Sequence, residues 1–293
     1  MMKKTIHLIT ALVFTLVLFS GCSQSDKPIV VGAKDYTEQD VLGNILLVLF
    51  KKNTDLNIRY KHEMASNVIF EAVKSGDVDV YIDYTGTIYG NYLNYSDMKT
   101  AVEVYDIAAR EMAEKYRLKV LQPLGFNNTY CLAVRPDTAQ QYNLKTYSDL
   151  ARVSSNFIFG GSFEILNRND GLPNLKKAYN MSFKTEMAVE GVLRYTSLKN
   201  DETQVTEAFS TDGMLLDYNL VVLEDDKNFF PPYQAVPVMR MPTAEKYPVI
   251  LEQLNRLSGL LNNDTMRELN YKVDVLKHDP LDVAREFLLR QDL

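Results

Sequence analysis

The sequence is poor in the residue types that most often carry chemistry. Its 293 residues include two cysteines, three histidines and no tryptophan. Cys22 follows an N-terminal apolar segment, so Cys131 is the only other cysteine. A framework of intramolecular disulfides is therefore excluded, and a hydrophobic core must supply the stability of the fold. We expect Cys131 to be a small core residue.

Motifs for catalysis and for metal or cofactor binding are also missing. His7 belongs to the N-terminal segment, and neither His62 nor His278 lies beside a candidate serine motif. The sequence has no H-E-x-x-H motif, no clustered Cys/His ligand set, no P-loop and no G-x-G-x-x-G motif. The acidic run at residues 224–226 could be read as a metal site, but adjacent carboxylates at a strand end are more typical of a solvated turn. We therefore predict a protein that is not an enzyme and has no metal or cofactor.

Positive charge is in deficit, with 32 Lys and Arg against 38 Asp and Glu and a formal net charge of −6. This balance has the wrong sign for a nucleic-acid surface. Beyond the N-terminal segment no apolar run approaches the ~20 residues that a transmembrane helix needs. We conclude that this sequence carries no permease domain of its own.

The N-terminus has the pattern of an export signal. Lys3 and Lys4 precede an apolar run, and small residues stand before Cys22. A cysteine at this place resembles the bacterial lipobox, although Phe19 stands where that motif usually has Leu. We expect residues 1–21 to be removed, Cys22 to be lipidated, residues 22–27 to act as a tether, and the protein to be anchored to the outer face of the cell membrane. A plain secretory peptide with an incidental cysteine is the alternative.

From residue 28 onward, strand patterns alternate with helix patterns. The segment IVVGAK is followed by apolar residues at helical spacing in residues 41–49, with Thr37 near the expected N-cap and Lys34 in the loop before it. A second helix then leads into DVDVYIDYTGT, residues 77–87, which alternates like a half-buried strand and ends in a tyrosine and two threonines. Open α/β sheets bind ligands at the carboxyl ends of their strands. We therefore expect a ligand site at Tyr84.

A second α/β unit begins after residue 135, and the chain then finishes with helices whose apolar faces must pack on a sheet. This order predicts an α/β protein of two lobes, each a mixed sheet flanked by helices, in a periplasmic-binding-protein-like (type II) fold. We expect lobe 1 to span 28–131 plus 236–293 and lobe 2 to span 132–235. The two crossing segments should lie near residues 131–136 and 230–238.

Tyrosine is the most abundant aromatic residue, with 18 in the sequence. Four of them, Tyr84, Tyr130, Tyr195 and Tyr218, occupy expected element ends or loops. Rings gathered around one point can hold a quaternary ammonium through their negative π faces, each contributing ~0.5–2 kcal/mol. We interpret Tyr233, between two prolines and a return strand, as packing at a crossing.

Motifs along nearly the whole mature chain resemble one family. They are, in order, VGAKDYTEQDVLGNIL, DVDVYIDYTGT, GFNNTYCLAVR, TYSDLA, FEILNRNDGLPNLKKAYNM, RYTSL, FSTDG and LVVLEDDKNFFPPYQAVPVMR. Together they resemble the substrate-binding proteins of osmoprotectant ABC importers, which bind glycine betaine, carnitine and choline. Any one motif is weak evidence, but their shared order is strong.

The resemblance implies that two lobes close on a ligand whose trimethylammonium sits in a tyrosine cage. The cage residues would be the four tyrosines named above. Thr87, Lys34 and Arg168 would contact the ligand carboxylate, and Asn128 and Asn67 are further expected contacts. Three of these residues also have a plainer interpretation: Tyr84 as strand-end packing, Lys34 as a solvated lysine, and Arg168 as half of a surface ion pair.

The resemblance also implies partners: a small quaternary amine, and the permease and ATPase subunits of an ABC importer. We expect a monomer. The two expected cationic contacts, Lys34 and Arg168, favour a carboxylate-bearing ligand such as glycine betaine or carnitine over choline. A choline- or larger-betaine-specific protein, an enzyme on the same two-lobed frame, and a surface lipoprotein acting as adhesin or chaperone remain alternatives.

Replacing Tyr84 or Tyr130 with alanine is expected to weaken binding of the quaternary amine by at least ~1 kcal/mol, because each variant loses one π face. Phenylalanine at either position should cost less, since the ring remains. Isothermal titration of the four variants measures the effect. Unchanged affinity in both alanine variants would contradict the cage.

Overall fold

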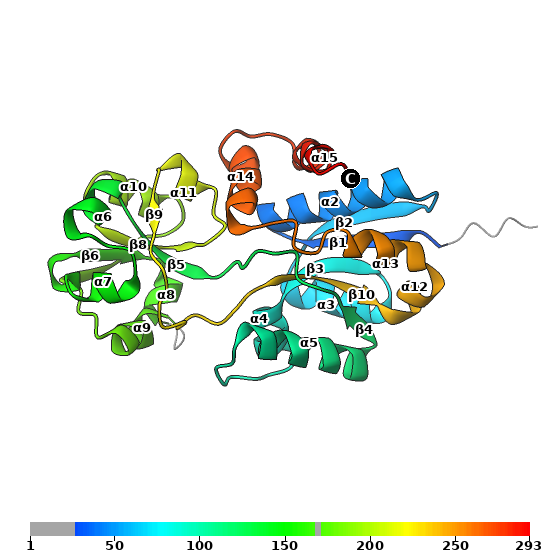
Figure 1. Cartoon of the computed structure of the whole chain (residues 1–293), viewed down its shortest axis with the longest axis horizontal. Helices are drawn as coiled ribbons and strands as arrows, with labels where there is room; N and C mark the ends of the chain where they lie inside the picture. The colour runs from blue at the N-terminus through cyan, green and yellow to red at the C-terminus, as the bar shows by residue number, and fades with distance from the viewer. Residues whose placement is uncertain (1–26, 168–170) are drawn as a thin grey trace, which may run out of the picture.

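The computed structural model describes residues 27–167 and 171–293. The expected signal segment, Cys22 and Arg168 lie outside the described residues. The described chain forms two lobes, each built around its own five-stranded sheet. Figure 1 shows the lobes side by side, joined by extended segments. The two-lobed mixed α/β architecture expected from the sequence is therefore confirmed.

Lobe 1 contains the sheet with strand order β2-β1-β3-β10-β4. Strand β1 pairs in parallel with β2 and β3, whereas β10 runs antiparallel to both β3 and β4. The sheet is mixed because β10 returns from the other lobe before it joins. The strands are β1 (Ile29–Lys34), β2 (Ile58–Met64), β3 (Val80–Tyr84), β4 (Leu118–Val120) and β10 (Ala235–Arg240).

Helices cover both faces of the first sheet (Figure 1). One face packs on α2 and the C-terminal helices through the largest apolar cluster, and α3 and α5 pack on the other face. The helices are α2 (Thr37–Asn53), α3 (Ser66–Ser75), α4 (Thr85–Thr87), α5 (Ala101–Tyr116), α12 (Met241–Lys246), α13 (Pro248–Asn255), α14 (Asn263–Asp274) and α15 (Pro280–Arg290), with a π-helical turn at Ile88–Tyr92.

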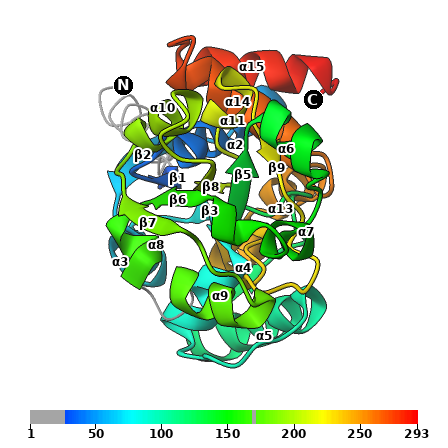
Figure 2. The same cartoon turned by 90° about the vertical axis from the view of Figure 1, so that its left-hand side faces the viewer.

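Lobe 2 contains the sheet with strand order β7-β6-β8-β5-β9, seen in Figure 2 with its flanking helices. Its strands are β5 (Tyr130–Val134), β6 (Ile158–Gly161), β7 (Thr185–Ala188), β8 (Val205–Phe209) and β9 (Val221–Val222). Its helices are α6 (Pro136–Tyr142), α7 (Tyr147–Ala151), α8 (Phe163–Asn167), α9 (Leu172–Tyr179), α10 (Leu193–Lys199) and α11 (Met214–Asp217), with a 3₁₀ turn at Ser154–Asn156. Cys131 is buried in its core, as expected.

Helix α2 follows from its apolar spacing. Val41, Leu42, Ile45, Leu46 and Leu49 recur on one face, and all are almost fully buried. The expected capping is wrong, however. The N-cap position is held by Tyr36 without a side-chain hydrogen bond, and the Thr37 hydroxyl donates instead to Asp274 Oδ1 at 2.6 Å.

The chain crosses between the lobes twice. The first crossing lies between β4 and β5; since β5 begins at Tyr130, Tyr130 and Cys131 belong to the second sheet, not to a crossing near 131–136. The second crossing lies between β9 and β10. The Asn128 N–H donates to Tyr233 O at 3.0 Å, and the Tyr233 N–H donates to Asn127 Oδ1 at 2.6 Å, so the two crossings are joined side by side.

Helix α14 makes a further contact between the lobes. Arg267 Nε donates to the backbone oxygen of Ser210 at 2.7 Å. Gly213 packs so closely on α14 that an added Cβ would lie 2.6 Å from the backbone nitrogen of Tyr271. Glycine at 213 is therefore required by this close approach between backbones.

Gly125 in the first crossing is expected to resist substitution. Its φ is +117°, and an added Cβ would overlap the backbone oxygen of Leu261. Gly125→Ala should lower the free energy of unfolding by about 2 kcal/mol or more, since it adds a backbone clash to an unfavourable φ. Urea unfolding followed by circular dichroism measures this.

Gly191→Ala is the matched control, because Gly191 also has a positive φ (+55°) but has no atom within 4 Å of an added Cβ. It should cost only about 1 kcal/mol. Equal losses in the two variants would show that the contact at Gly125 does not matter.

Candidate ligand-binding site

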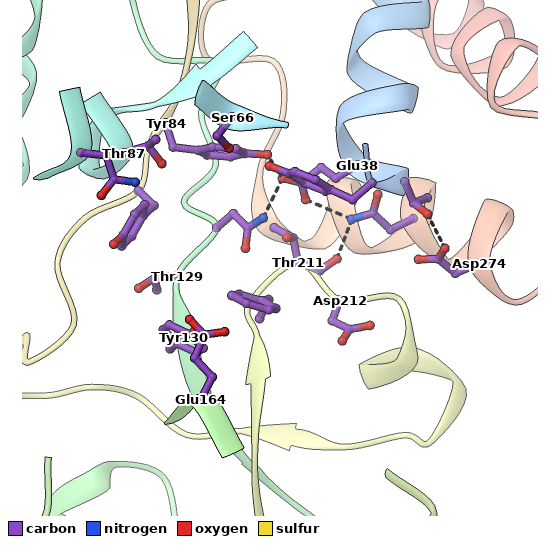
Figure 3. Close-up of a pocket in the computed structure, with 17 residues that line it drawn as sticks. Glu38, Ser66, Tyr84, Thr87, Thr129, Tyr130, Glu164, Thr211, Asp212 and Asp274 are labelled. Carbon is purple, nitrogen blue, oxygen red and sulfur yellow. Dashed lines mark hydrogen bonds between the residues drawn. The ribbon is translucent and has the colours of Figure 1, made fainter. Parts of the chain in front are cut away.

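A cavity of about 630 Å³ lies where the two lobes and the two crossings meet. This volume is within the range of small-molecule sites. Figure 3 shows Tyr84 and Thr87 on one side and Tyr130 and Glu164 on the other. The lining residues are Tyr36, Thr37, Glu38, Ser66, Tyr84, Thr87, Asn91, Asn128, Thr129, Tyr130, Glu164, Phe209, Thr211, Asp212, Tyr233, Asn270 and Asp274.

Aromatic rings line the cavity from both lobes. Tyr84 is the last residue of β3, so its ring stands at the carboxyl end of that strand. Tyr130 and Phe209 pair across β5 and β8, with ring centroids 4.8 Å apart. Tyr36 and Phe209 are 41% and 42% exposed, which is unusual for large aromatic residues. These rings offer π faces to a ligand that enters from solvent.

Glu38 is a buried carboxylate in the cavity wall, held in the first turn of α2. The Tyr84 hydroxyl donates to its Oε1 at 2.5 Å, as does Asn128 Nδ2 at 2.9 Å. Asn270 Nδ2 donates to Oε2 at 3.0 Å. Burial raises the pKa of Glu38, while these hydrogen bonds and one from Thr211 act in the opposite direction. Glu38 thus gathers donors from β3, the first crossing, lobe 2 and α14.

Four of the site residues expected from the sequence line this cavity. Tyr84 and Thr87 come from the end of β3 and the turn after it, and Tyr130 from the start of β5. Asn128 comes from the first crossing, where its amide donates to Glu38. The structure therefore brings these four residues together.

Lys34 does not line the cavity. It is the last residue of β1, not a loop residue, and it points inward, where its ammonium lies 2.5 Å from Asp83 Oδ1. Both side chains are almost fully buried. The ammonium also lies 5.3 Å from the centroid of the Tyr84 ring. Lys34 is thus neither a solvated lysine nor a cavity-lining cation, and it packs behind Tyr84.

Tyr195 and Tyr218 lie together in lobe 2, with ring centroids 5.7 Å apart, and neither lines the cavity. The Tyr195 hydroxyl donates to Asp212, which does line it. Tyr195 is buried and stacks with the Arg194 guanidinium, 5.0 Å from the ring centroid. The pair therefore forms a layer behind Asp212.

Asn67 lies apart from the cavity, on exposed surface at the start of α3. It lines a second, more open hollow with Val68, Phe70, Tyr92 and Tyr116, among others. Asn91 lines both hollows, so the two adjoin. Arg168, the remaining expected contact, lies outside the described residues.

Several cavity residues were missed from the sequence. Tyr36 and Glu38 flank Thr37, where the sequence pattern predicted only the start of a helix. Phe209 ends β8, the same kind of position that identified Tyr84. Tyr233 was assigned to packing, and it both packs on the core and lines the cavity. Asn270 comes from α14, and no local motif pointed to it.

The described residues offer little for catalysis or metal binding. Within them no group of three or more His, Cys, Asp or Glu side chains is arranged to hold a metal ion. Burial raises the pKa of the Cys131 thiol to about 12, so it is not a thiolate nucleophile.

No helix in the described ranges has the length and apolar character needed to cross a membrane.

The fold and the cavity define a two-lobed solute-binding protein. A family model described as the substrate binding domain of the ABC-type glycine betaine transport system (OpuAC) matches residues 27–290. The chain belongs to this family, and it is a transport protein, not an enzyme. It is the extracytoplasmic substrate-binding component of a betaine/carnitine-type ABC importer.

Named relatives agree on the family. The chain is 38% identical to the ergothioneine transport permease/ergothioneine binding protein EgtU of Helicobacter pylori over 92% of its length, but it spans only 48% of that relative. It is 34% identical to the carnitine transport binding protein OpuCC of Listeria monocytogenes, covering 100% of this chain and 98% of the relative. A crystal structure described as a glycine betaine/carnitine/choline ABC transporter superposes with a TM-score of 0.87 at 29% identity, covering 90% of this chain and 98% of the other.

The ion pair between Lys34 and Asp83 predicts a stability effect. Lys34→Met should lower the free energy of unfolding by about 3–5 kcal/mol, because it leaves a buried charge without its partner. Chemical unfolding measures this, with Lys51→Met on the exposed surface of α2 as the control.

The double variant Lys34→Met/Asp83→Asn should recover part of the loss, since no unpaired charge remains. A loss in Lys34→Met no larger than in the Lys51 control would contradict this assignment of Lys34.

Proposed function

We propose that the protein captures a quaternary ammonium solute, such as glycine betaine, carnitine or a related betaine, and delivers it to an ABC permease. The observation that carries the proposal is the cavity wall, where aromatic rings from both lobes stand beside carboxylates. The carboxylates are Glu38, Glu164, Asp212 and Asp274, and no described Lys or Arg lines the cavity. Such a wall favours a large, weakly hydrated cation.

The cationic group would sit against a cage of Tyr84, Tyr130, Tyr195 and Tyr218. Tyr84 and Tyr130 support this directly, since they line the cavity from opposite lobes. Tyr195 and Tyr218 stand one layer behind Asp212 in the same lobe, so their contact with a ligand needs Asp212 to move aside within lobe 2. Tyr36 and Phe209 add exposed rings at the same cavity.

The ligand carboxylate would face Thr87 and Arg168, with Asn128 nearby. Thr87 supports this role as a cavity-lining hydroxyl on the turn after β3. Lys34 was expected at the carboxylate too, but its ammonium is engaged by Asp83. In the proposed complex Lys34 supports the Tyr84 ring from behind. A contact with the ligand would require the ion pair to break.

Delivery would follow capture by closure of the lobes. A ligand that contacts both lobes stabilises the closed arrangement by its differential contacts with it. The two lobes would move about the paired crossings. The expected bounds, 28–131 plus 236–293 and 132–235, would then shift, because β5 of lobe 2 already begins at Tyr130 and β10 of lobe 1 begins at Ala235. Lipidation of Cys22 would hold the monomer at the outer face of the membrane, beside the permease and ATPase subunits.

A larger betaine is the second candidate. The relative that is 38% identical is named for ergothioneine, a betaine with a bulky ring, and another is named for carnitine. A cavity of about 630 Å³ has room for either. Choline lacks the carboxylate that Arg168 would contact, so we expect it to bind more weakly than the betaines.

A titration panel is expected to identify the ligand. Glycine betaine, carnitine, proline betaine, ergothioneine and choline are titrated calorimetrically into the purified mature protein, with γ-aminobutyrate as a primary-amine control. At least one betaine should bind saturably and be recovered unchanged after incubation. Binding of none of the quaternary amines, or binding of the primary amine alone, would overturn the proposed function.

A further inference from the structure

Glu38 differs from the other buried carboxylates of the described chain. Five carboxylate residues are buried there, and four of them have a cationic partner. Those four pairs are Asp83 with Lys34 at 2.5 Å, Glu111 with Lys115 at 2.7 Å, Glu207 with Arg194 at 3.5 Å, and Asp79 with Arg240 at 3.8 Å. Within the described ranges, no ion pair includes Glu38. It is the exception to a consistent pattern of charge compensation.

The partners of Glu38 stabilise its charge without neutralising it. Its oxygens accept hydrogen bonds from the Tyr84 hydroxyl and from the amides of Asn128 and Asn270. Asn270 Nδ2 donates also to the backbone oxygen of Thr211, so its orientation is fixed by two acceptors. All these donors are neutral. A buried charge without an opposite charge is costly, so a cation beside Glu38 would stabilise its ionised form.

We propose that Glu38 is the counter-ion of the ligand's cationic group. The inference rests on the proposed function and adds to it a residue that sets specificity for charge. Glu38 lines the same cavity as Tyr84, and the Tyr84 hydroxyl is its closest donor, so a cation on that ring lies next to the carboxylate. Out of bulk water, such an attraction is weakly screened.

The arrangement suits a fully methylated nitrogen. Three hydrogen bonds from the protein occupy most of the about four lone-pair sites of the Glu38 carboxylate, so it would act on the ligand mainly by its charge. A quaternary ammonium has no N–H to donate and loses nothing by this. The aromatic faces and the carboxylate thus select the same chemical group by two independent interactions.

A purely structural role is the alternative. Glu38 joins α2, β3, the first crossing and α14 by hydrogen bonds, and a residue that only joined them would affect stability. It would not distinguish a charged ligand from an uncharged ligand of the same shape. Charge selectivity, rather than affinity alone, is therefore the measurement that separates the two roles.

The experiment compares ligands that differ only in the charged atom. Glycine betaine is paired with 3,3-dimethylbutanoate, and choline with 3,3-dimethylbutan-1-ol, in which carbon replaces the quaternary nitrogen. Calorimetry on the mature wild type and Glu38→Gln gives the affinity ratio within each pair. We expect the preference for the member with the quaternary nitrogen to fall at least tenfold in Glu38→Gln.

Glu207→Gln is the matched control. Glu207 is also buried and its pKa is also raised by burial, but Arg194 compensates its charge and it does not line the cavity. The affinity ratio between the ammonium ligand and its carbon analogue should be unchanged in this variant. Thermal unfolding of each variant shows whether it is folded at the temperature of the titration.

A second readout uses the wild type alone and does not depend on any variant folding. Burial raises the pKa of Glu38, and a bound cation would lower it again, so binding should release protons near that raised pKa. Affinity should then fall as the pH is lowered towards it. The titratable groups around Glu38 are the Tyr84 and Tyr36 hydroxyls, and Asp212, Asp274 and Glu164 line the same cavity. Calorimetry in buffers of different ionisation enthalpy measures the protons released.

The outcomes separate the inference from the proposed function. A reduced ratio in Glu38→Gln with proton release in the wild type supports the counter-ion. If the wild type binds betaines but the ratio is unchanged in Glu38→Gln, or binding releases no protons across the acidic range, the inference is overturned and the proposed function stands. If the wild type binds no quaternary amine, both fail.

Discussion

The insertion of β10 between β3 and β4 is the constraint on which the rest of the structure depends. This strand returns from lobe 2 and pairs antiparallel with β3, with Ala235 opposite Tyr84. The backbone oxygen of Gln234 accepts a hydrogen bond from the Thr85 N–H, so the second crossing reaches lobe 1 at the point where β3 ends. The first crossing is bonded alongside it. The ligand cavity therefore lies at the junction of the lobes because β3 ends at that junction.

Buried charge is distributed unevenly around this junction. Behind Tyr84, Lys34 and Asp83 form a compensated pair that also receives hydrogen bonds from the Tyr84 N–H and the Tyr92 hydroxyl. Beside the cavity, Glu38 has only neutral donors. One charge pair thus supports the Tyr84 ring from within the core, and one carboxylate, without a cationic partner among the described residues, lines the ligand cavity. The same tyrosine links the two, through its backbone to one and its hydroxyl to the other.

Much of the fold was predictable from the sequence because it follows from periodicity. The apolar spacing of α2 is a local signal that maps directly onto burial in the structure. The alternation before Tyr84 predicted the strand, but not its burial: β3 is buried at every position because helices cover both faces of the sheet, so the expectation of a half-buried strand is wrong. The same alternation placed Tyr84 and Thr87 at the carboxyl end of β3, where the cavity lies. Tyr130 is at the amino end of β5, and its place in the site was expected from the family resemblance. The positions that could be predicted are those where a local pattern and a general rule about sheets coincide.

The remaining assignments depended on tertiary contacts that no local pattern carries. Lys34 was expected in a loop, but β1 extends one residue further and turns its side chain towards Asp83. Thr37 was expected to cap α2, but Asp274, 237 positions along the chain, takes its hydroxyl. The hydroxyl of Tyr195 is likewise taken by Asp212. In each case a polar side chain was interpreted by its sequence neighbours, while its partner came from another element.

The close approach of Gly213 to the backbone of α14 has a mechanical consequence. Helix α14 belongs to the helical layer of lobe 1, yet its middle rests directly on the loop before α11 in lobe 2 with no side chain between them. Together with the two crossings, this contact supplies a third point of support away from the hinge strands. A side chain at position 213 would force α14 and this loop apart, so the missing Cβ is what lets the lobes touch at this third place.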